Sequence, residues 1–452
     1  MRLVMQAYPG YNQSDMGGVG VKVISQPTNS LDGKPVDSIW RRIFSQAIRT
    51  NATDIHIEPQ AGALLVRLRR QGALSTDLTL AAVTAKPLAL EIKQMAGLNL
   101  KQTKAPQEST FSQVHNHHIY HLNVDTMPLV SGERIVIHIY DPMAQPPELT
   151  DLGLWGKSLQ AFQNALTSPH GLILISGPNH SGVSTTLASC AAALSSPLNH
   201  IASVEENAAY NVSDVNYMTV RPTSGMTWSR VLRMQLKHEP NIVIVGNLPD
   251  RETAEITVTA ANQQQLFLSG IRADSATAAT MQIIRLSGNP LDLAASLRLV
   301  CNQRLVPKLC PDCREAYTPD TTLQNNLTKK FHLDKSESLL QLQQFVIEAK
   351  YQLMDDRVPI TSEWGNGQNS IVKLWRAKDG GCIKCRKSGI NGAVGLFEII
   401  TVSDVLRQQL AQTLSASASQ AGILANRIYS LQLDGLVKAL CGLISIDTVP
   451  DL

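Results

Sequence analysis

The apolar and polar residues of the first 145 positions predict an α+β domain after a short leader. Residues 1–36 are rich in Gly, Ser, Asn and Pro and show little periodicity, so we expect them to be poorly ordered. An apolar stripe at helical spacing follows, with Asp37 and Ser38 as its expected cap. We place an α+β domain at residues 37–145. Half-buried strands are predicted in it where apolar and polar residues alternate, over residues 64–69, 119–124 and 134–140.

Short apolar runs in the next part predict a buried parallel sheet. Helical patterns separate these runs, and such alternation is typical of a sheet with right-handed crossovers. In such a sheet, ligands bind beyond the carboxyl ends of the strands. A proline-containing linker at 142–147 marks the start of this domain, which we place at residues 146–300. The runs lie at residues 172–175, 201–204, 242–245 and 266–268.

The last part of the chain, residues 301–452, has a different pattern. It contains two cysteine pairs, an amphipathic or loosely organised segment at 315–375 and a tail from Val402 that we predict to be helical. The apolar positions of this predicted tail include Ile423 and Ile428.

Composition indicates a globular protein. Hydrophobic residues make up 43% of the chain and charged residues 17%, as in proteins with sizeable cores. The net charge of +3 gives no reason to expect a nucleic-acid partner. No stretch approaches the ~20 apolar residues of a membrane span, and no signal-peptide pattern precedes the chain's first helix. We therefore expect a cytoplasmic location.

Four of the seven cysteines form two C-x-x-C pairs, which predict a metal site. Cys310 and Cys313 make the first pair, and Cys382 and Cys385 make the second. Four thiolates at this spacing suit tetrahedral Zn²⁺ with a structural role, since no ligand position is left open. The alternative is four unrelated reduced cysteines. The other cysteines lie on apolar stretches and are expected in the core: Cys190, Cys301 and Cys441.

A glycine-rich turn follows the first apolar run and predicts a phosphate-binding loop. Its glycines and Ser184 fit the pattern G-x-x-x-x-G-K-[ST], except that Val183 stands where the lysine should be. A strand, a glycine-rich turn and a helix in this order surround phosphates with backbone N–H groups. We expect ATP and Mg²⁺ to bind at the loop residues Gly177, Pro178, Asn179, His180, Ser181, Gly182, Val183, Ser184 and Thr185.

Several motifs in a fixed order give the chain a family resemblance, which extends from about Trp40 to Val449. With the glycine-rich turn, they resemble the ATPases that drive type II secretion and type IV pilus assembly. The resemblance implies an α/β fold: a RecA-like P-loop NTPase motor domain, preceded by an α+β domain and followed by a zinc-binding C-terminal subdomain. The motifs are Thr53–Pro59, Glu205 within Ser-Val-Glu-Glu, Val245–Ala254, Gln303–Cys310 and Gly395–Ile399.

The resemblance also implies an assembly and its partners. Members of this family would form a hexameric ring on the cytoplasmic face of a bacterial inner membrane, beneath a platform protein of that membrane. We expect this chain to be peripheral to the membrane, in a homo-hexamer or in a mixed ring with an intact paralogue.

Compared with the family pattern, groups needed for ATP hydrolysis are missing. Val183 cannot supply the lysine's cation, and an ionic hydrogen bond of this type is worth roughly 1.5–3 kcal/mol. Asn179 and His180 replace a small Thr-Gly pair. The resemblance retains Glu205 as a candidate catalytic residue, in the segment that polarises water. The family's catalytic glutamate, two histidines and two arginines correspond here to Asn247, to Gln265 and Arg272, and to Asn123 and His138.

We therefore expect ATP binding with weak or absent hydrolysis. The alternative is an active ATPase that powers pilus or pseudopilus polymerisation with relocated catalytic groups, such as a cation from Arg272 or Lys237.

Polar clusters in the first domain have two interpretations each. Histidines in the segment 115–121 suggest a metal site, but surface or otherwise satisfied histidines are favoured because no carboxylate or other supporting partner is evident. The acidic and histidine side chains of segment 53–59, namely Asp54, His56 and Glu58, are expected to make interdomain hydrogen bonds instead of acting in catalysis. Two interpretations account equally well for the strand arginines: they contact the nucleotide of a neighbouring subunit, or they line a solvated strand face. These arginines are Arg67, Arg69 and Arg70.

Overall fold

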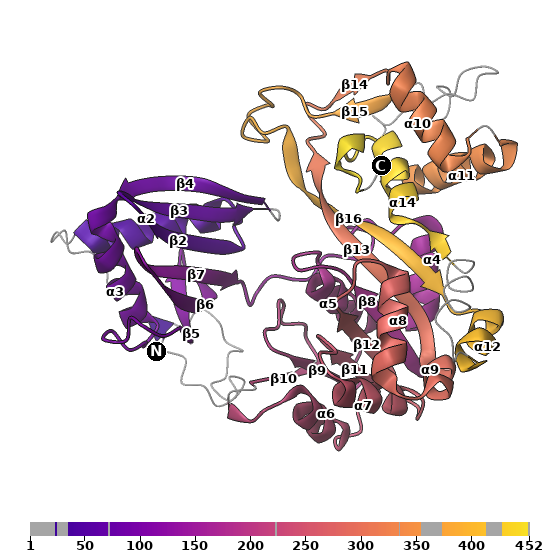
Figure 1. Cartoon of the computed structure of the whole chain (residues 1–452), viewed down its shortest axis with the longest axis horizontal. Helices are drawn as coiled ribbons and strands as arrows, with labels where there is room; N and C mark the ends of the chain where they lie inside the picture. Colours follow the sequence, from indigo (N-terminus) through magenta and orange to yellow (C-terminus); the bar gives the residue numbers. More distant parts are fainter. Residues whose placement is uncertain are drawn as a thin grey trace. The chain divides into compact units, whose positions relative to one another are not determined.

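The chain folds into two compact units, residues 1–144 and 145–452 (Figure 1). The computed structural model describes residues 23–24, 35–70, 73–221, 224–333, 335–353, 373–412 and 427–450. The division after Ala144 falls within the predicted proline-containing linker. The predicted leader lies almost wholly outside the described residues and stays a prediction.

The first unit is a sheet with helices on one face. Its elements are β1 Val23–Ile24, α2 Pro35–Arg49, β2 Asp54–Gln60, β3 Ala63–Arg70, β4 Ala73–Ala81, η2 Ala82–Thr84, α3 Ala85–Met95, β5 Gln107–His115, β6 His118–Leu129 and β7 Gly132–Tyr140. The seven strands have the order β1-β5-β6-β7-β2-β3-β4, and all neighbours are antiparallel except β1 and β5. The predicted α+β organisation of this unit is confirmed.

Strand alternation builds the core of the first unit. Ile55 and Ile57 of β2 are buried against Trp40 and Phe44 of α2. The residues between them, such as His56, belong to the opposite face of the sheet because strand side chains alternate. The helix begins earlier than expected, since Pro35 is its first residue and Asp37 and Ser38 lie inside its first turn. Proline suits the first position of a helix, where its missing N–H has no partner to lose.

The second unit is built on an eight-stranded sheet (Figure 1). In chain order, its elements up to residue 296 are α4 Gly156–Leu166, β8 Gly171–Ser176, α5 Val183–Leu194, β9 Ile201–Glu205, β10 Val215–Thr219, α6 Trp228–Leu236, β11 Ile242–Val245, α7 Arg251–Ala261, β12 Leu266–Ile271, α8 Ala276–Ser287 and α9 Pro290–Ser296. The remaining elements are β13 Leu297–Leu309, β14 Glu315–Tyr317, α10 Thr321–Phe331, α11 Ser336–Leu353, β15 Leu374–Arg376, β16 Ile390–Thr401, α12 Asp404–Gln412, β17 Arg427–Tyr429, α14 Leu431–Leu440 and η4 Ile446–Thr448.

Helices cover both faces of this sheet. The strand order is β10-β9-β11-β12-β8-β13-β16-β17. The first six strands in this order are parallel to their neighbours, whereas β16 is antiparallel to both β13 and β17. One face packs against α4 and α5 through residues such as Phe162 and Cys190. The other packs against α6 to α9 through residues such as Val258 and Ile283. The predicted α/β fold with a mostly parallel sheet is therefore confirmed.

The C-terminal region continues from the same sheet. Strand β13 crosses the boundary expected between residues 300 and 301 without a break, and residues 145–452 form one unit. A further apolar cluster joins the end of β13 to α10, α11, β16 and α14. The tail is not wholly helical as expected, because Ile428 belongs to strand β17. Part of the predicted segment 315–375 and Ile423 lie outside the described residues.

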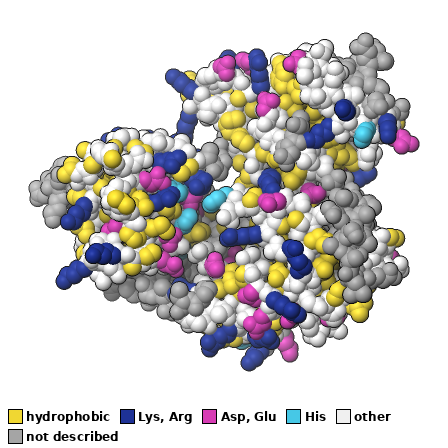
Figure 2. Space-filling view, in the orientation of Figure 1, with side chains coloured by type: hydrophobic (Ala, Val, Ile, Leu, Met, Phe, Trp, Pro, Cys, Tyr) yellow, Lys and Arg dark blue, Asp and Glu magenta, His cyan; other side chains and the backbone are white. Residues whose placement is uncertain are grey.

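The described surface carries both signs of charge. Figure 2 shows basic and acidic side chains interspersed on the face in view of each unit. Among the described residues, no helix combines the length and the apolar character that crossing a bilayer requires.

Candidate functional site

The glycine-rich loop lies at the centre of the second unit's sheet. Strand β8 is buried along its whole length between β12 and β13, and the loop connects its end to α5. His180 and Gly182 have positive φ angles of 62° and 91°. The strand–loop–helix arrangement expected for a phosphate-binding loop is present, with the loop at the carboxyl edge of the parallel strands.

Gly177 allows the loop to fold back on itself. A Cβ on Gly177 would lie 2.2 Å from Ser181 Oγ and 2.7 Å from the Gln303 carbonyl oxygen. No side chain larger than hydrogen fits there without moving the backbone. The first glycine of the motif is therefore explained by a steric contact within the loop.

Gln303 holds the loop from the neighbouring strand β13. Its Nε2 donates to the Ser181 carbonyl oxygen at 2.8 Å, and its Oε1 accepts from Thr186 Oγ1 at 2.9 Å. Gln303 is almost completely buried, so these bonds are shielded from water. The sequence placed Gln303 in a family motif but gave no role to its side chain, because the pairing of β13 with β8 joins positions far apart in the chain.

Val183 packs where the motif has its lysine. A Cβ added to Gly270 would lie 3.2 Å from Val183 Cγ1. The same Cβ would lie 2.2 Å from the Gly246 carbonyl oxygen. Val183 also packs against the apolar cluster on the α5 face of the sheet. An apolar side chain therefore fills the space beside the ends of β11 and β12, while the next residue, Ser184, is exposed.

Glu205 ends strand β9 at the same edge of the sheet. Burial raises the pKa of its carboxyl group to about 7, although a 2.5 Å hydrogen bond from Ser203 Oγ acts in the opposite direction. Gly246 leaves room for it, since a Cβ there would lie 3.0 Å from Glu205 Cγ. Asn247 follows Gly246 directly, so the structure brings the retained and the replaced acidic positions to neighbouring strand ends. A carboxyl group with a pKa near neutrality suits proton transfer.

The positions expected for the family's two histidines lie at opposite edges of the sheet. Gln265 precedes β12, and its Nε2 donates to the Pro240 carbonyl oxygen at 3.1 Å, near the beginning of β11. Arg272 follows β12 at the carboxyl edge and is exposed. Six strand residues span about 20 Å, so of these two only Arg272 lies beside the loop.

Lys237 does not supply a cation to this loop within its own chain. It follows α6 and precedes β11, which places it at the amino-terminal edge of the parallel strands. The expectation of a relocated cation from Lys237 is wrong for this reason. Arg272, by contrast, lies at the carboxyl edge of the parallel strands, as the loop does.

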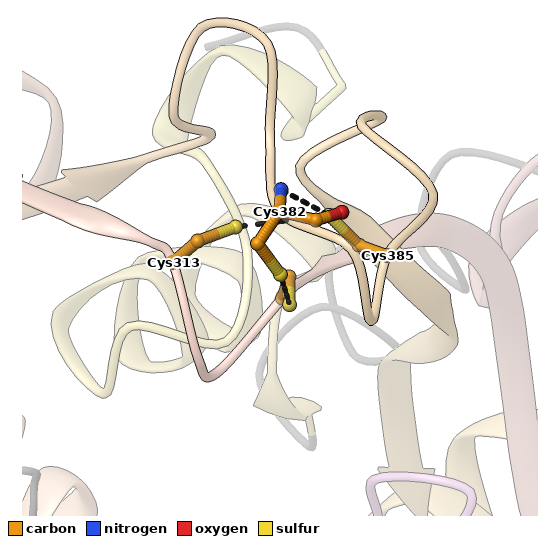
Figure 3. A group of neighbouring side chains, drawn as sticks. Cys313, Cys382 and Cys385 are labelled. Carbon is orange, nitrogen blue, oxygen red and sulfur yellow. Dashed lines mark hydrogen bonds between the residues drawn. The ribbon is translucent and has the colours of Figure 1, made fainter.

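The four paired cysteines converge into one cluster, as Figure 3 shows for three of them. The Sγ atoms of Cys310, Cys313, Cys382 and Cys385 all lie within 4.8 Å of one another. The Cys310–Cys382 and Cys313–Cys385 Sγ distances are 3.8 and 3.7 Å. A tetrahedron with Zn–S bonds of about 2.3 Å has edges of about 3.8 Å, so these two distances match the edges of a zinc tetrathiolate.

Backbone donors support the second cysteine pair. The N–H groups of Cys382 and Gly389 donate to Cys385 Sγ at 3.1 and 3.2 Å. The bond from Cys382, followed by the bond from Gly389, lowers the pKa of Cys385 to about 6, against an opposing contribution from burial. Such N–H···S bonds favour the thiolate that a metal requires. The remaining cysteines are buried in the core as predicted: Cys190, Cys301 and Cys441.

Comparison with known proteins identifies the family. The family model described as "Type II/IV secretion system protein" matches residues 29–449. The chain belongs to this family. This agrees with the resemblance drawn from the motifs.

Relatives of this type II/IV secretion system protein include secretion and pilus proteins. The chain is 30% identical over 420 residues to the type II secretion system ATPase E of Vibrio cholerae, covering 93% of this chain and 76% of the relative. It is 27% identical to the type IV pilus assembly ATPase PilB of Thermus thermophilus, covering 93% of this chain and 43% of PilB.

Solved structures agree on the fold. The ATPase DotB of Legionella pneumophila superposes with a TM-score of 0.60 at 16% identity, covering 95% of this chain and 98% of DotB. DotB of Yersinia pseudotuberculosis gives a TM-score of 0.62 at 14% identity, covering 96% and 98%.

In this secretion system protein, the two positions expected to carry arginines are neighbours in the first unit. Asn123 of β6 lies directly opposite His138 of β7. His138 Nδ1 is hydrogen-bonded to Asp54, and its Nε2 lies 3.6 Å from Asp125 Oδ2. The bond to Asp54 raises the pKa of His138. This side chain is held by carboxylates of its own unit.

Carboxylates of the first unit also pair with its strand arginines. Asp54 and His56 are buried on the face of the sheet opposite Ile55 and Ile57. Burial lowers the pKa of His56. Interdomain bonds from this segment stay a prediction, and so does a contact of the arginines with a neighbour's nucleotide. The pairs are Arg67 with Glu58 at 3.4 Å, Arg69 with Asp54 at 3.0 Å, and Arg70 with Asp77.

The histidine-rich segment forms a hairpin between β5 and β6. Asn116 and His117 have the positive φ angles of a tight two-residue turn. His118 Nε2 lies 2.6 Å from Asp141 Oδ1, so the expectation that no carboxylate partner is nearby was wrong. Among the described residues, only the cysteine cluster brings together three or more side chains able to hold a metal. Histidines that lie at the surface or are satisfied by protein partners therefore remain the better interpretation, with His117 exposed and His121 Nδ1 2.6 Å from Ser112 Oγ.

Proposed function

We propose that this type II/IV secretion system protein is a ring subunit that binds ATP with Mg²⁺ at residues 177–185 and hydrolyses it weakly or not at all. The packing of Val183 against the ends of β11 and β12 carries this proposal. The lysine of a P-loop stabilises charge on the β- and γ-phosphates, and a packed valine side chain cannot do so. The loop backbone and Ser184 remain to hold phosphates and Mg²⁺.

The other catalytic positions support weak hydrolysis. Asn247 stands where the family has its catalytic glutamate, and an amide cannot accept a proton from water as a carboxylate does. Glu205 is the remaining acidic candidate, with a pKa of about 7. His138, in place of an arginine, is bonded to Asp54. The effects of losing several catalytic groups at one site are not additive. Each electrostatic group of this kind nevertheless accelerates the reaction by a factor of about 10²–10³.

Steady-state phosphate release by the purified full-length protein tests the proposal. We expect ATP binding by calorimetry in the presence of Mg²⁺, with turnover far below about 1 s⁻¹, the low end of ordinary phosphoryl transfer. A turnover of about 1 s⁻¹ would contradict weak hydrolysis and favour an active ATPase with relocated groups. That alternative draws its support from Arg272 and Glu205.

The double variant Val183→Lys with Asn247→Glu separates two causes of weak hydrolysis. Restored turnover would mean that the site lacks only charge. Continued inactivity with intact ATP binding would mean that the site lacks more than these two groups, whether in the loop geometry at Asn179 and His180 or at the replaced arginine positions Asn123 and His138.

The cysteine cluster is proposed to hold one structural Zn²⁺. The thiolates of the four cysteines would fill all of its coordination positions, and the ion would tie the end of β13 to the loop before β16. The ring, whether homo-hexameric or mixed with an intact paralogue, is proposed to lie at the cytoplasmic face of the inner membrane and to dock on a platform protein. No nucleic-acid partner is proposed.

A further inference from the structure

We propose that Arg272 supplies the cation for the nucleotide phosphates that Val183 cannot supply. This inference rests on the proposed nucleotide binding at residues 177–185. It assigns the charge of the site to the end of a neighbouring strand instead of the loop.

The pairing of β12 with β8 places Arg272 beside the loop. The two strands are parallel, with Gly270 opposite Ile175 and Ile271 opposite Ser176. The next residues are Arg272 on one strand and Gly177, the first residue of the loop, on the other. Adjacent strands are about 4.8 Å apart, which is less than the length of an extended arginine side chain.

The alternation of β12 directs this position toward the loop and α5. Leu266 and Leu268 pack in the cluster on the α5 face, and Gly270 abuts Val183. Phe267 and Ile271 pack on the opposite face. Since strand side chains alternate with a period of two, Arg272 is next in the series on the α5 face.

Arg272 is also available for an anion. It is exposed, and among the described residues no hydrogen bond or ion pair engages its guanidinium. Arg304, at the loop's other flank on β13, differs because its Nη2 donates to the Asp274 carbonyl oxygen at 2.8 Å and lies 3.5 Å from Asp274 Oδ1. A guanidinium binds phosphate oxygens in a bidentate manner, and its planar donors can approach from the side of the loop.

Calorimetric titration of the full-length protein with ATP, ADP and adenosine in Mg²⁺ tests this assignment. Arg272→Gln should weaken ATP and ADP about tenfold to a hundredfold, the range of a lost ionic hydrogen bond, and leave adenosine unchanged. Arg272→Lys should retain part of the affinity. Lys237→Gln, at the other edge of the sheet, is the matched control and should bind like the wild type.

A second variant distinguishes phosphate binding from a structural effect. Val183→Lys in the Arg272→Gln background should recover affinity for ATP, because the cation returns from the loop. Equal ATP binding by the wild type and Arg272→Gln would overturn the role of Arg272 alone. A lack of ATP binding by the wild-type protein would overturn both this inference and the proposed function. Equal losses for ATP and adenosine would assign Arg272 to the loop's structure and overturn the inference as well.

Discussion

At the scale of single residues, close backbone contacts decide which side chains the nucleotide site accepts. Gly177, Gly246 and Gly270 each have a neighbour that a Cβ would approach within 3.0 Å. Val183 and Glu205 lie against two of these glycines. The space around the loop is therefore set by strand ends, and a side chain such as Val183 occupies the room that the glycines leave.

Glu205 should give the protein a measurable dependence of stability on pH. Its pKa is raised from 4.5 to about 7 in the folded protein. Between these values the folded protein holds a proton that the unfolded chain has lost, so raising the pH favours unfolding. At about 1.4 kcal/mol per pH unit, Glu205 should lower the free energy of unfolding by about 3 kcal/mol from pH 4.5 to pH 7.

Chemical denaturation of variants at several pH values checks this dependence. Glu205→Gln should remove the part of the decline that Glu205 causes, while Glu206→Gln, at an exposed position, should keep the slope of the wild type. A wild-type slope in Glu205→Gln would show that the carboxyl group is already ionised in the folded protein.

At the scale of elements, two short loops form the cysteine cluster and connect distant parts of the C-terminal region. One loop follows β13 and the other precedes β16, and these two strands are antiparallel partners. Lys384 Nζ also contacts Asp312 Oδ1 across the loops at 2.8 Å. The C-x-x-C spacing predicted a metal site, but only the pairing of β13 with β16 explains why the two pairs meet.

Metal analysis and unfolding measurements test the cluster. We expect about one zinc per chain, in keeping with four thiolate ligands. Cys385→Ser should lose the metal and lower stability by several kcal/mol, because metal binding and folding are coupled. Cys441→Ser is the control, since this buried cysteine lies outside the cluster and its replacement should leave the zinc content unchanged. Folded wild-type protein without stoichiometric metal would contradict the assignment.

At the scale of the whole molecule, a buried ion pair joins the tail to the sheet of the second unit. Lys438 and Asp434 of α14 form the pair, and Lys438 Nζ also donates to the Gly395 carbonyl oxygen at 2.7 Å. Asp434 Oδ2 accepts from the Phe397 N–H at 2.8 Å. Both contacts reach β16, so the tail is an integral part of the unit that carries the nucleotide site.

Breaking this pair should destabilise the second unit strongly. Lys438→Met leaves the Asp434 carboxylate buried without its cation, at an expected cost of about 3–5 kcal/mol in the free energy of unfolding. The double variant Lys438→Met with Asp434→Asn should be less destabilised, because asparagine still accepts from the Phe397 N–H and no charge is buried. Denaturant unfolding of the two variants tests this prediction. Equal free energies of unfolding would assign the lost stability to the packing of Lys438 alone.

The sequence by itself determined the family, the α/β fold and the principal candidate sites of this protein. Strand runs, a glycine-rich turn and cysteine spacing are local patterns, and the physical requirements behind them act within a few residues. Val183 and Asn247 were therefore recognisable as departures from the family pattern without a structure. The leader, the C-terminal boundary at residue 300 and the assembly state are not decided by these local patterns.

Only the tertiary structure decided which distant residues meet. It placed Arg272 beside the loop and Gln265 at the far edge, and it gave Gln303 its two bonds to the loop. It also paired His118 with Asp141. These relations depend on strand order and register, which are set by packing across the whole sheet and not by any short stretch of chain.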